Sequence, residues 1–337
     1  MISKFKIKNK IYESYKKIMI IAEIGSNHDN NLKKCKKLIL EAKKVGCDGV
    51  KFQLFKADKL VSKKFNNKGY KILKKLELKE SWIPILARFC KKNKILFICS
   101  PFYLEAVDLL LKYKCDIIKI ASPEIKNIPL LKKSISTNLP LIISTGDTDL
   151  NLINKAVRCL KKKNYSKVGL LQCTSQYPCK KENTNLLNIK YLKKKIDSKI
   201  SIGFSDHTLG TEASLIAVSM GANIIEKHIT LNKKSKGPDH FFALEIKELK
   251  KMVSLIRDFE KYTGEFVKKR LLEENTVNIS LFSSKKIFKN EKLTLKNVTY
   301  KRDLSKGIPA YNIKSILGKK IKLDLDEDEK ITYSILK

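Results

Sequence analysis

Short apolar segments alternate with longer amphipathic segments along most of the chain. The short segments have the length and apolar character of buried strands, and the longer ones have the three- and four-residue apolar spacing of helices. Strands are expected at 19–24, 49–54, 95–100, 117–121, 141–145, 168–173, 200–205 and 223–228. Helices are expected near 32–45, 80–93, 104–113, 128–137, 149–162, 185–196, 210–220 and 246–262. This alternation predicts parallel strands that are joined by helices.

The number and spacing of these elements favour a (β/α)8 TIM barrel, whose functional groups lie at the carboxyl ends of the strands. A doubly wound open sheet is the alternative, but no G-x-G-x-x-G sequence follows the first strand. The barrel is expected to span 18–264, after a basic leader or edge strand at 1–17.

The pattern changes after the last expected helix. A charged segment at 265–279 is expected to be a linker, and short alternating runs separated by turns predict a small β-rich domain at 280–337. Because so short a segment buries little apolar surface, we expect it to dock on the barrel or on another subunit.

The composition is strongly basic, with a formal net charge of +37 and 71 lysine and arginine residues. Only five of these are arginine, and the lysines are spread over every segment instead of forming one stripe. Arginine is favoured for contacts with phosphates and base edges, so a nucleic-acid partner is not expected. A positive field still attracts a small anionic substrate.

Compartment and redox state follow from other features of the sequence. No run approaches 18 apolar residues, and the N-terminal segment lacks the apolar core of a signal peptide, so we expect a cytoplasmic protein without a membrane span. The eight cysteines form no C-x-x-C pair, which predicts reduced, packed thiols and argues against disulfides or a zinc site.

Two histidines end successive expected strands, His207 in FSDHT and His228 in EKHIT. Neighbouring parallel strands lie about 4.8 Å apart, so imidazoles at their carboxyl ends can reach one divalent ion. The alternative is that each histidine is a hydrogen-bonded structural residue. With only four histidines in the chain, the pair favours a shared metal site.

Two lysines lie in apolar strand sequences, Lys51 in GVKFQ and Lys119 in IIKIAS. An unpaired buried ammonium is costly. A phosphate or carboxylate ligand would offset that cost, and a buried ion pair with a neighbouring glutamate is the alternative.

The chain resembles the sialic acid synthases through motifs that occur in the same order, namely IIAEIGSNH, GVKFQ, SPF, IKIAS, ISTG, LQCTSQYP, FSDHT, EKHIT and GPDH. The resemblance covers about 20–335, and its last segment resembles the antifreeze-like (SAF, β-clip) domain of that family. It implies a transferase that condenses phosphoenolpyruvate with N-acetylmannosamine or a related 2-acetamido sugar to form a nonulosonic acid. It also implies a divalent metal cofactor, Mn²⁺ before Mg²⁺ or Co²⁺.

The resemblance further implies roles for individual residues. His207 and His228 would bind the metal, and Glu124 or Glu23 would act as the acid/base group. Phosphoenolpyruvate would contact Lys51, Ser100, Lys119, Ser122, Ser144, Ser175 and Ser205. The sugar would contact Glu23, Gln53, Tyr177 and Asp239. Arg302 would be lent to the sugar site of a partner subunit, which implies a domain-swapped homodimer.

The sequence leaves three questions of function open. Within the family, the product is N-acetylneuraminate, legionaminate or pseudaminate. Another phosphoenolpyruvate aldol-type synthase on a related barrel is a second enzyme class, against which the SAF-like tail and GPDH argue. An inactive sugar-binding or nucleic-acid-binding module is a third, against which the intact histidine and lysine pairs argue.

Overall fold

The computed structural model describes residues 3–160, 162–265, 267, 278–304 and 307–337. The chain divides into two compact units, Met1–Gly264 and Glu265–Lys337, and each is described by itself. Most of the expected linker at 265–279 lies outside the described residues.

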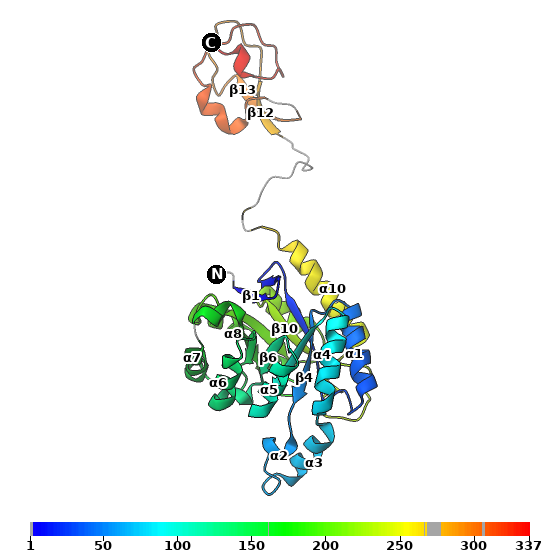
Figure 1. Ribbon diagram of the computed structural model, residues 1–337. Helices are drawn as coiled ribbons and strands as arrows, with labels where there is room; N and C mark the ends of the chain where they lie inside the picture. The colour runs from blue at the N-terminus through cyan, green and yellow to red at the C-terminus, as the bar shows by residue number, and fades with distance from the viewer. Residues whose placement is uncertain (1–2, 161, 266, 268–277, 305–306) are drawn as a thin grey trace. The chain divides into compact units, whose positions relative to one another are not determined.

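Eight parallel strands form a closed barrel in the described part of the first unit (Figure 1). Each strand pairs with the next along the chain, and the last one, β10, pairs with both β9 and β3. The strands are β3 (Met19–Gly25), β4 (Gly49–Leu54), β5 (Leu96–Pro101), β6 (Ile117–Ile120), β7 (Leu141–Ser144), β8 (Val168–Cys173), β9 (Ser201–Asp206) and β10 (Ile224–Thr230). A short strand, β11 (Leu244–Glu245), also pairs with β10. The predicted (β/α)8 barrel is confirmed, and the open sheet is excluded.

The helices that cover the barrel begin and end close to the expected positions. They are α1 (Leu32–Lys44), α4 (Ile83–Lys92), α5 (Leu104–Lys112), α6 (Ile128–Ser136), α7 (Leu150–Cys159), α8 (Leu187–Lys195), α9 (Glu212–Ser219) and α10 (Ile246–Tyr262). Two further helices, α2 (Ala57–Leu60) and α3 (Asn67–Leu76), follow β4 and project from the barrel (Figure 1). They were not predicted because α2 is a single turn and α3 buries none of its residues.

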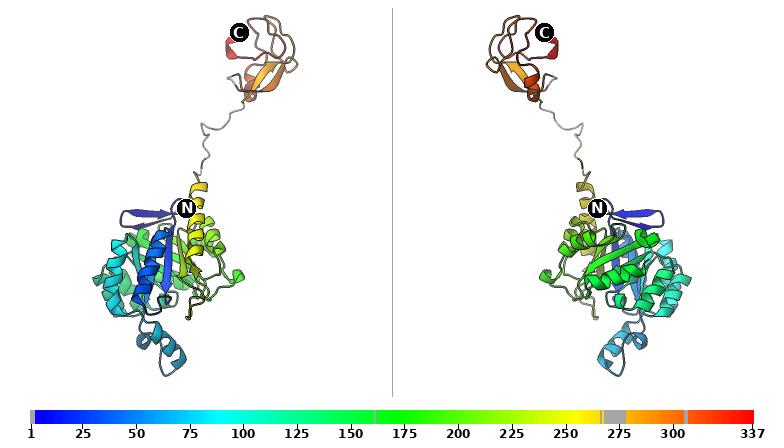
Figure 2. Two further views of the ribbon diagram at one scale, coloured as in Figure 1. Left: turned by 90° about the vertical axis from the view of Figure 1, so that its right-hand side faces the viewer. Right: turned by 90° about the vertical axis from the view of Figure 1, so that its left-hand side faces the viewer.

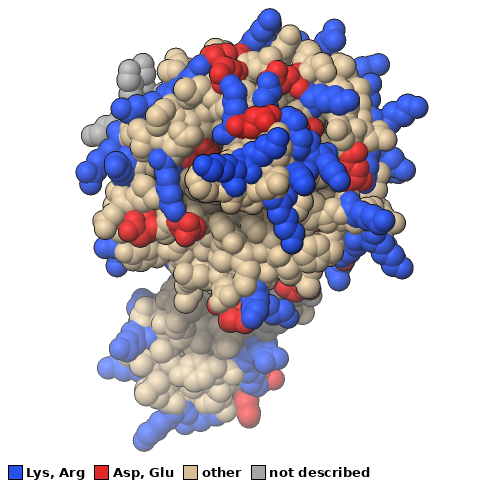
Figure 3. Space-filling view, turned by 90° about the horizontal axis from the view of Figure 1, so that it is seen from below, with Lys and Arg blue, Asp and Glu red and all other residues tan. Residues whose placement is uncertain are grey.

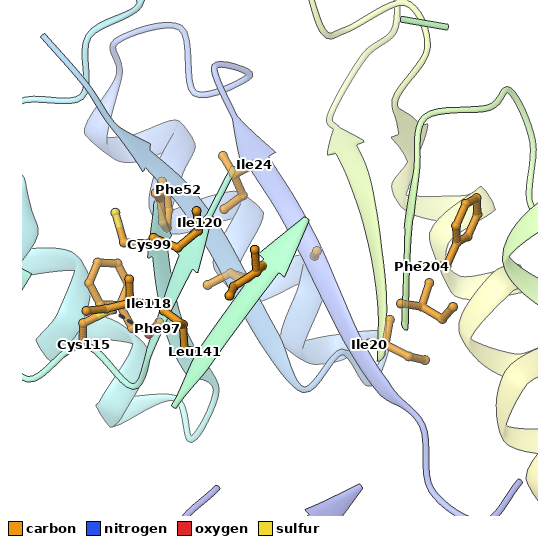
Figure 4. Packing of buried hydrophobic residues seen from close by; sticks show 14 of the residues in the cluster. Ile20, Ile24, Phe52, Phe97, Cys99, Cys115, Ile118, Ile120, Leu141 and Phe204 are labelled. Carbon is orange, nitrogen blue, oxygen red and sulfur yellow. Dashed lines mark hydrogen bonds between the residues drawn. The ribbon is translucent and has the colours of Figure 1, made fainter. Parts of the chain in front are cut away.

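Alternate residues of each strand point to opposite faces, which separates two apolar layers. Outward residues pack against the helices, and Figure 4 shows Ile20, Phe52 and Phe204 among them. Inward residues near the amino ends of the strands form a second cluster inside the barrel, which includes Ile21 and Ile98.

The N-terminal segment forms a hairpin and not the expected edge strand. Strands β1 (Lys4–Ile7) and β2 (Lys10–Glu13) pair with each other in a separate antiparallel sheet. Figure 2 shows this hairpin across the end of the barrel opposite α2 and α3. Phe5, Ile7 and Tyr12 are buried against the inward apolar residues of the barrel. The hairpin therefore closes the amino end, which leaves the carboxyl end for a site.

Phe5→Ala is expected to lower the free energy of unfolding by about 3–5 kcal/mol, because it opens a cavity between the hairpin and the amino end of the barrel. Phe5 is fully buried, whereas Ile11, on the same hairpin, is 46% exposed. Ile11→Ala is therefore the matched control and is expected to cost less than about 1 kcal/mol. Urea unfolding measures both variants. Equal losses for the two would show that the hairpin does not cap the barrel core.

The second unit has a core of its own. Strands β12 (Asn278–Ser283) and β13 (Val298–Asp303) pair antiparallel, and isolated bridges and the 3-10 helices η5 (Ala310–Ser315) and η6 (Tyr333–Ile335) complete the described part. Its buried cluster includes Leu281, Ile308 and Ile331.

Two further findings bear on environment. All eight cysteines are free thiols. Among the described residues, no helix combines the length and apolar character needed to cross a membrane.

Candidate active site

Polar side chains occupy the next inward position above the apolar layer inside the barrel. A step of two residues from an inward apolar residue leads from Ile21 to Glu23 and from Ile98 to Ser100, and other strands follow the same rule. The buried polar layer contains Glu23, Lys51, Ser100, Lys119, Ser144, Ser205, Glu226 and His228. The strand period therefore brings these residues together at the carboxyl end of the barrel.

A carboxylate lies between Lys51 and Lys119, the two lysines inside the barrel. Glu226 Oε1 is 3.2 Å from Lys51 Nζ and 3.6 Å from Lys119 Nζ, and Glu23 Oε1 is 3.1 Å from Lys51 Nζ. Ser205 also donates a hydrogen bond to Glu226 Oε1 at 3.2 Å. The ion-pair alternative for the buried lysines is therefore present in the structure, and Lys51 is the more fully paired of the two.

Charge and burial act in opposite directions on these groups. Burial raises the pKa of Glu226, but Lys119 and Lys51 outweigh it and hold that pKa well below its usual range. Burial also raises the pKa of Glu23, and Lys51 only partly opposes this. Burial lowers the pKa of Lys119, and Glu226 only partly restores it. Lys119, which donates a 2.6 Å hydrogen bond to Ser144 Oγ, is thus the ammonium that gains most from a bound anion.

Glu226 is the main residue of this layer to which the sequence reasoning assigned no role. The sequence EKHIT indicates its position, because Glu226 precedes His228 by two residues and so lies on the same inward face of the strand.

Glu226→Ala is expected to lower the free energy of unfolding by about 3 kcal/mol or more, because it leaves two buried ammoniums without their shared carboxylate. The matched control is Asp108→Ala, which breaks the exposed pair with Lys133 and is expected to cost less than about 1 kcal/mol. Chemical denaturation at pH 7 compares the two variants. A cost for Glu226→Ala no larger than that of the control would contradict the compensating role.

The two histidines face each other at the strand ends. Their ring centroids are 5.5 Å apart, and Tyr177, on the loop after β8, packs 4.1 Å from His207 and 6.3 Å from His228. His207 Nδ1 lies 2.9 Å from the Thr174 carbonyl oxygen, to which it donates as Nδ1–H, so in the neutral ring Nε2 carries the lone pair.

His228 is suited to bind a cation in its neutral form. Burial lowers its pKa to about 3, although Asp239 opposes this, so the ring is neutral at pH 7. Its Nδ1 is buried without a hydrogen-bond partner, and the nearest carboxylate oxygen, Asp239 Oδ2, is 3.8 Å away. A neutral imidazole with an unpaired nitrogen fits a divalent metal. Within the described residues, however, no group of three or more His, Cys, Asp and Glu side chains forms a complete ligand set. Water or substrate oxygens would therefore have to supply the other ligands.

Four predicted hydroxyls lie at or after the carboxyl ends of the barrel strands, and one of them contacts a lysine. Ser144 accepts from Lys119, and Ser100 Oγ is buried without a partner. Ser122 Oγ accepts from Gly146 N at 3.0 Å. A Cβ atom at Gly146 would lie 2.5 Å from Ser175 Oγ and 2.8 Å from Ser122 Oγ, so only glycine allows these two hydroxyls to approach the end of β7.

An open cleft of about 790 Å³ lies beside Ser175, at the carboxyl ends of β7 and β8. Its lining is mainly uncharged and polar and includes Thr145, Gln172, Thr174, Ser175 and Asn188.

The other predicted residues lie in different surroundings. Gln53 donates a 2.7 Å hydrogen bond to Glu23, and Asp239 accepts one of 2.9 Å from Ser26. Glu124 accepts from Asn127 at 3.0 Å. Among the described residues, no hydrogen bond or ion pair joins Glu124 to the lysines. Burial raises its pKa.

Arg302 lies on β13 in the second unit, opposite Ile279. Its role in a partner's site stays a prediction.

Around the carboxyl end of the barrel, the basic side chains are spread over the surface and do not form a continuous stripe (Figure 3). Figure 3 views the chain from below in Figure 1, the side on which α2 and α3 project. Lysine and arginine side chains are spread over this face, with acidic side chains between them. Such a field attracts small anions.

A parallel barrel with paired imidazoles, lysines, carboxylates and hydroxyls at the carboxyl ends of its strands has the architecture of a TIM-barrel enzyme. The chain belongs to the NeuB family, whose model matches residues 38–268. The resemblance to sialic acid synthases is thereby confirmed.

Individual relatives cover nearly the whole chain. The N,N'-diacetyllegionaminic acid synthase of Campylobacter jejuni is 40% identical over 94% of this chain and 99% of its own. The human N-acetylneuraminate-9-phosphate synthase is 32% identical over 94% of this chain and 92% of its own. The crystal structure of N-acetylneuraminic acid synthetase from Leptospira borgpetersenii in complex with citrate is 32% identical, with a TM-score of 0.76, and the match covers 81% of this chain and 94% of that one.

Proposed function

We propose that this protein is a nonulosonic acid synthase, which condenses phosphoenolpyruvate with a 2-acetamido sugar and releases phosphate by C–O cleavage. The observation that carries the proposal is the buried Lys119–Ser144 contact, 2.6 Å long, in the same polar layer as the facing rings of His207 and His228. It combines an anion-binding group with a pair of metal ligands. Two relatives are named as synthases of diacetyllegionaminic acid and of N-acetylneuraminate 9-phosphate, which supports this chemistry.

The anion would be held by charge-assisted hydrogen bonds. Lys119 would donate to the phosphate, together with hydroxyls such as Ser100, whose buried Oγ has no partner in the structure. Lys51 would bind the same ligand while staying paired with Glu23 and Glu226. Ser122, Ser144, Ser175 and Ser205 would complete the cradle.

The sugar would be oriented by Gln53, Tyr177 and Asp239, so that its open-chain carbonyl faces the enol carbon C3. A divalent ion held by His207 and His228, Mn²⁺ before Mg²⁺ or Co²⁺, would supply Lewis-acid polarisation of that carbonyl. C3 attacks the carbonyl carbon, water adds at C2, and the C2–O bond to phosphate breaks.

A carboxyl group must move protons to the sugar oxygen and from the water. Burial raises the pKa of both candidates, to about 7 for Glu23 and above its usual value for Glu124. We favour Glu124 for this role, because Glu23 is already held by Lys51 and Gln53.

The acceptor is the part of the proposal that an assay settles most directly. Purified protein with phosphoenolpyruvate and Mn²⁺ is incubated separately with N-acetylmannosamine, its 6-phosphate and a 6-deoxy diacetamido sugar, and product mass and phosphate release are recorded. Identity with the diacetyllegionaminic acid synthase makes the diacetamido sugar the first acceptor to test. Turnover with arabinose 5-phosphate alone would instead indicate the other aldol-type class. No phosphate release with any sugar would indicate an inactive binding module.

We also propose that the second unit is an SAF domain that lends Arg302 to the partner's site in a domain-swapped homodimer. Arg302→Ala and His228→Ala are each expected to be inactive alone. Mixed dimers of the two chains would combine one intact barrel with one intact Arg302, so random mixing restores about a quarter of the wild-type rate. Differently tagged chains verify that mixed dimers form. Mixed dimers without activity would show that Arg302 does not act across subunits.

A further inference from the structure

A buried ion pair lies on the outward face of the barrel strands, where most residues are apolar. Asp206 and Lys227 are directly opposite each other in the pairing of β9 with β10, and Lys227 Nζ is 3.0 Å from Asp206 Oδ2. Both residues are almost fully buried. They share the outward strand faces with Phe204 and Ile225, which pack against helices in the hydrophobic core. Neither residue faces the polar layer inside the barrel, so the proposed chemistry does not use them.

The pair is bonded to the backbone that carries His207. Asp206 Oδ1 accepts from Thr208 N at 2.8 Å and from Thr208 Oγ1 at 2.7 Å, while Lys227 Nζ donates to the Thr208 carbonyl at 2.6 Å. On the other side, Cys179 N donates to the His207 carbonyl at 2.8 Å. Every backbone hydrogen-bonding group of Thr208, together with the carbonyl of His207, therefore has a fixed partner.

Each member of the ion pair directly precedes one of the two histidines in the sequence. His207 follows Asp206 and His228 follows Lys227, so each imidazole points to the face opposite that of its neighbour. Any slip or rotation between the ends of β9 and β10 changes the distance between the rings. Lys227 Nζ contacts both the Asp206 carboxylate, directly across the strand pair, and the Thr208 carbonyl, one residue after His207. These two contacts oppose both the slip and the rotation of one strand end against the other.

Stability alone does not explain a charged pair in this place. Replacing a buried ion pair by apolar side chains of similar volume is often neutral or stabilising. The geometry points to a different role. We propose that Asp206 and Lys227 are positioning residues that set the separation of His207 and His228, and thereby the affinity of the site between them for a divalent cation. The inference rests on the metal role in the proposed function. Partners that hold metal ligands in place typically contribute about 10- to 100-fold in affinity.

The test separates positioning from folding. The double variant Asp206→Leu/Lys227→Met replaces the pair by apolar side chains of similar size. It is expected to unfold at a lower urea concentration than the wild type, because the Thr208 N–H and carbonyl lose their side-chain partners. Where it stays folded, it is expected to bind Mn²⁺ about 10- to 100-fold more weakly, as measured from the electron paramagnetic resonance signal of free Mn²⁺. A folded double variant with wild-type Mn²⁺ affinity would overturn the inference.

A milder variant covers the case in which the double variant does not fold. Ser214, on α9, donates a 2.6 Å hydrogen bond to Asp206 Oδ2 and lies seven residues beyond His207. Ser214→Ala is expected to weaken Mn²⁺ binding several-fold. Ser134→Ala is the matched control, because Ser134 is an equally buried helix serine whose hydroxyl has no partner. Equal Mn²⁺ affinities for the two serine variants would count against the inference.

Failure of the metal role is distinguishable from failure of this inference. If the wild type binds no Mn²⁺, the metal role is wrong, and amide hydrogen exchange of Thr208 in the metal-free protein decides the positioning role. Exchange is expected to be faster in Ser214→Ala than in Ser134→Ala, because Asp206 loses one of the hydrogen bonds that hold its carboxylate against Thr208. Equal exchange in the two variants would overturn the inference.

Discussion

His228→Ala is expected to lower kcat/KM by about 10³-fold or more while the barrel stays folded. The substitution removes one of the two facing imidazoles and leaves His207 without its partner. Lewis-acid stabilisation of a developing alkoxide contributes several kcal/mol, and a loss of about 4 kcal/mol corresponds to about 10³-fold in rate. Because His228 Nδ1 has no hydrogen-bond partner, the substitution leaves no group unpaired at that atom.

Steady-state kinetics and Mn²⁺ titration of the same preparation measure the effect. His240→Gln is the matched control, since His240 is also buried but is bonded to Asp29 and Thr230 and not to the facing pair. It is expected to retain the Mn²⁺ stoichiometry of the wild type. Wild-type rates for His228→Ala, or undiminished rates of the wild type in metal-free buffer, would contradict the role of this histidine.

Lys119→Met is expected to raise the KM for phosphoenolpyruvate by about 30- to 100-fold, and the KM for the sugar by less than about threefold. A hydrogen bond to a charged group contributes about 1.5–3 kcal/mol, and a loss of about 2–2.7 kcal/mol corresponds to a 30- to 100-fold change in affinity. Methionine keeps most of the side-chain volume, and Glu226 retains Lys51 as its partner at 3.2 Å. Loss of the ammonium should therefore weaken anion binding without opening a large cavity.

The control for this variant is Lys193→Met. Lys193 is a half-buried lysine, but it donates to Ser14 Oγ and the Gly221 carbonyl, beside the N-terminal hairpin. It is expected to change stability and not the KM for phosphoenolpyruvate. An unchanged KM for phosphoenolpyruvate in Lys119→Met would reject the assignment.

Much of the site could be read from local periodicity. A strand period of two places Glu23, Lys119 and Ser144 on the inward face, because each lies two residues beyond an inward apolar position. The same period of two places His207 two residues beyond Ser205 and His228 two residues beyond Glu226, at the strand ends. These features are local, so they are available before the fold is known.

Other features depend on elements that local patterns describe poorly. The N-terminal hairpin has only four residues in each strand, and its burial depends on the open end of the barrel beneath it. Helix α2 is a single turn, and α3 has an amphipathic sequence but buries none of its residues. The ion pair between Asp206 and Lys227 looks like two ordinary polar residues at strand ends until β9 and β10 are paired.

The sequence by itself determined the order of strands and helices, the face that each strand side chain takes, and which residue types reach the carboxyl end. Closure of β10 onto β3 and β9 is a non-local event, and only the tertiary structure decided it. That closure brings Glu226 within 3.2 Å of Lys51 and sets the 5.5 Å separation of the histidine rings, since both depend on how distant segments align across the barrel.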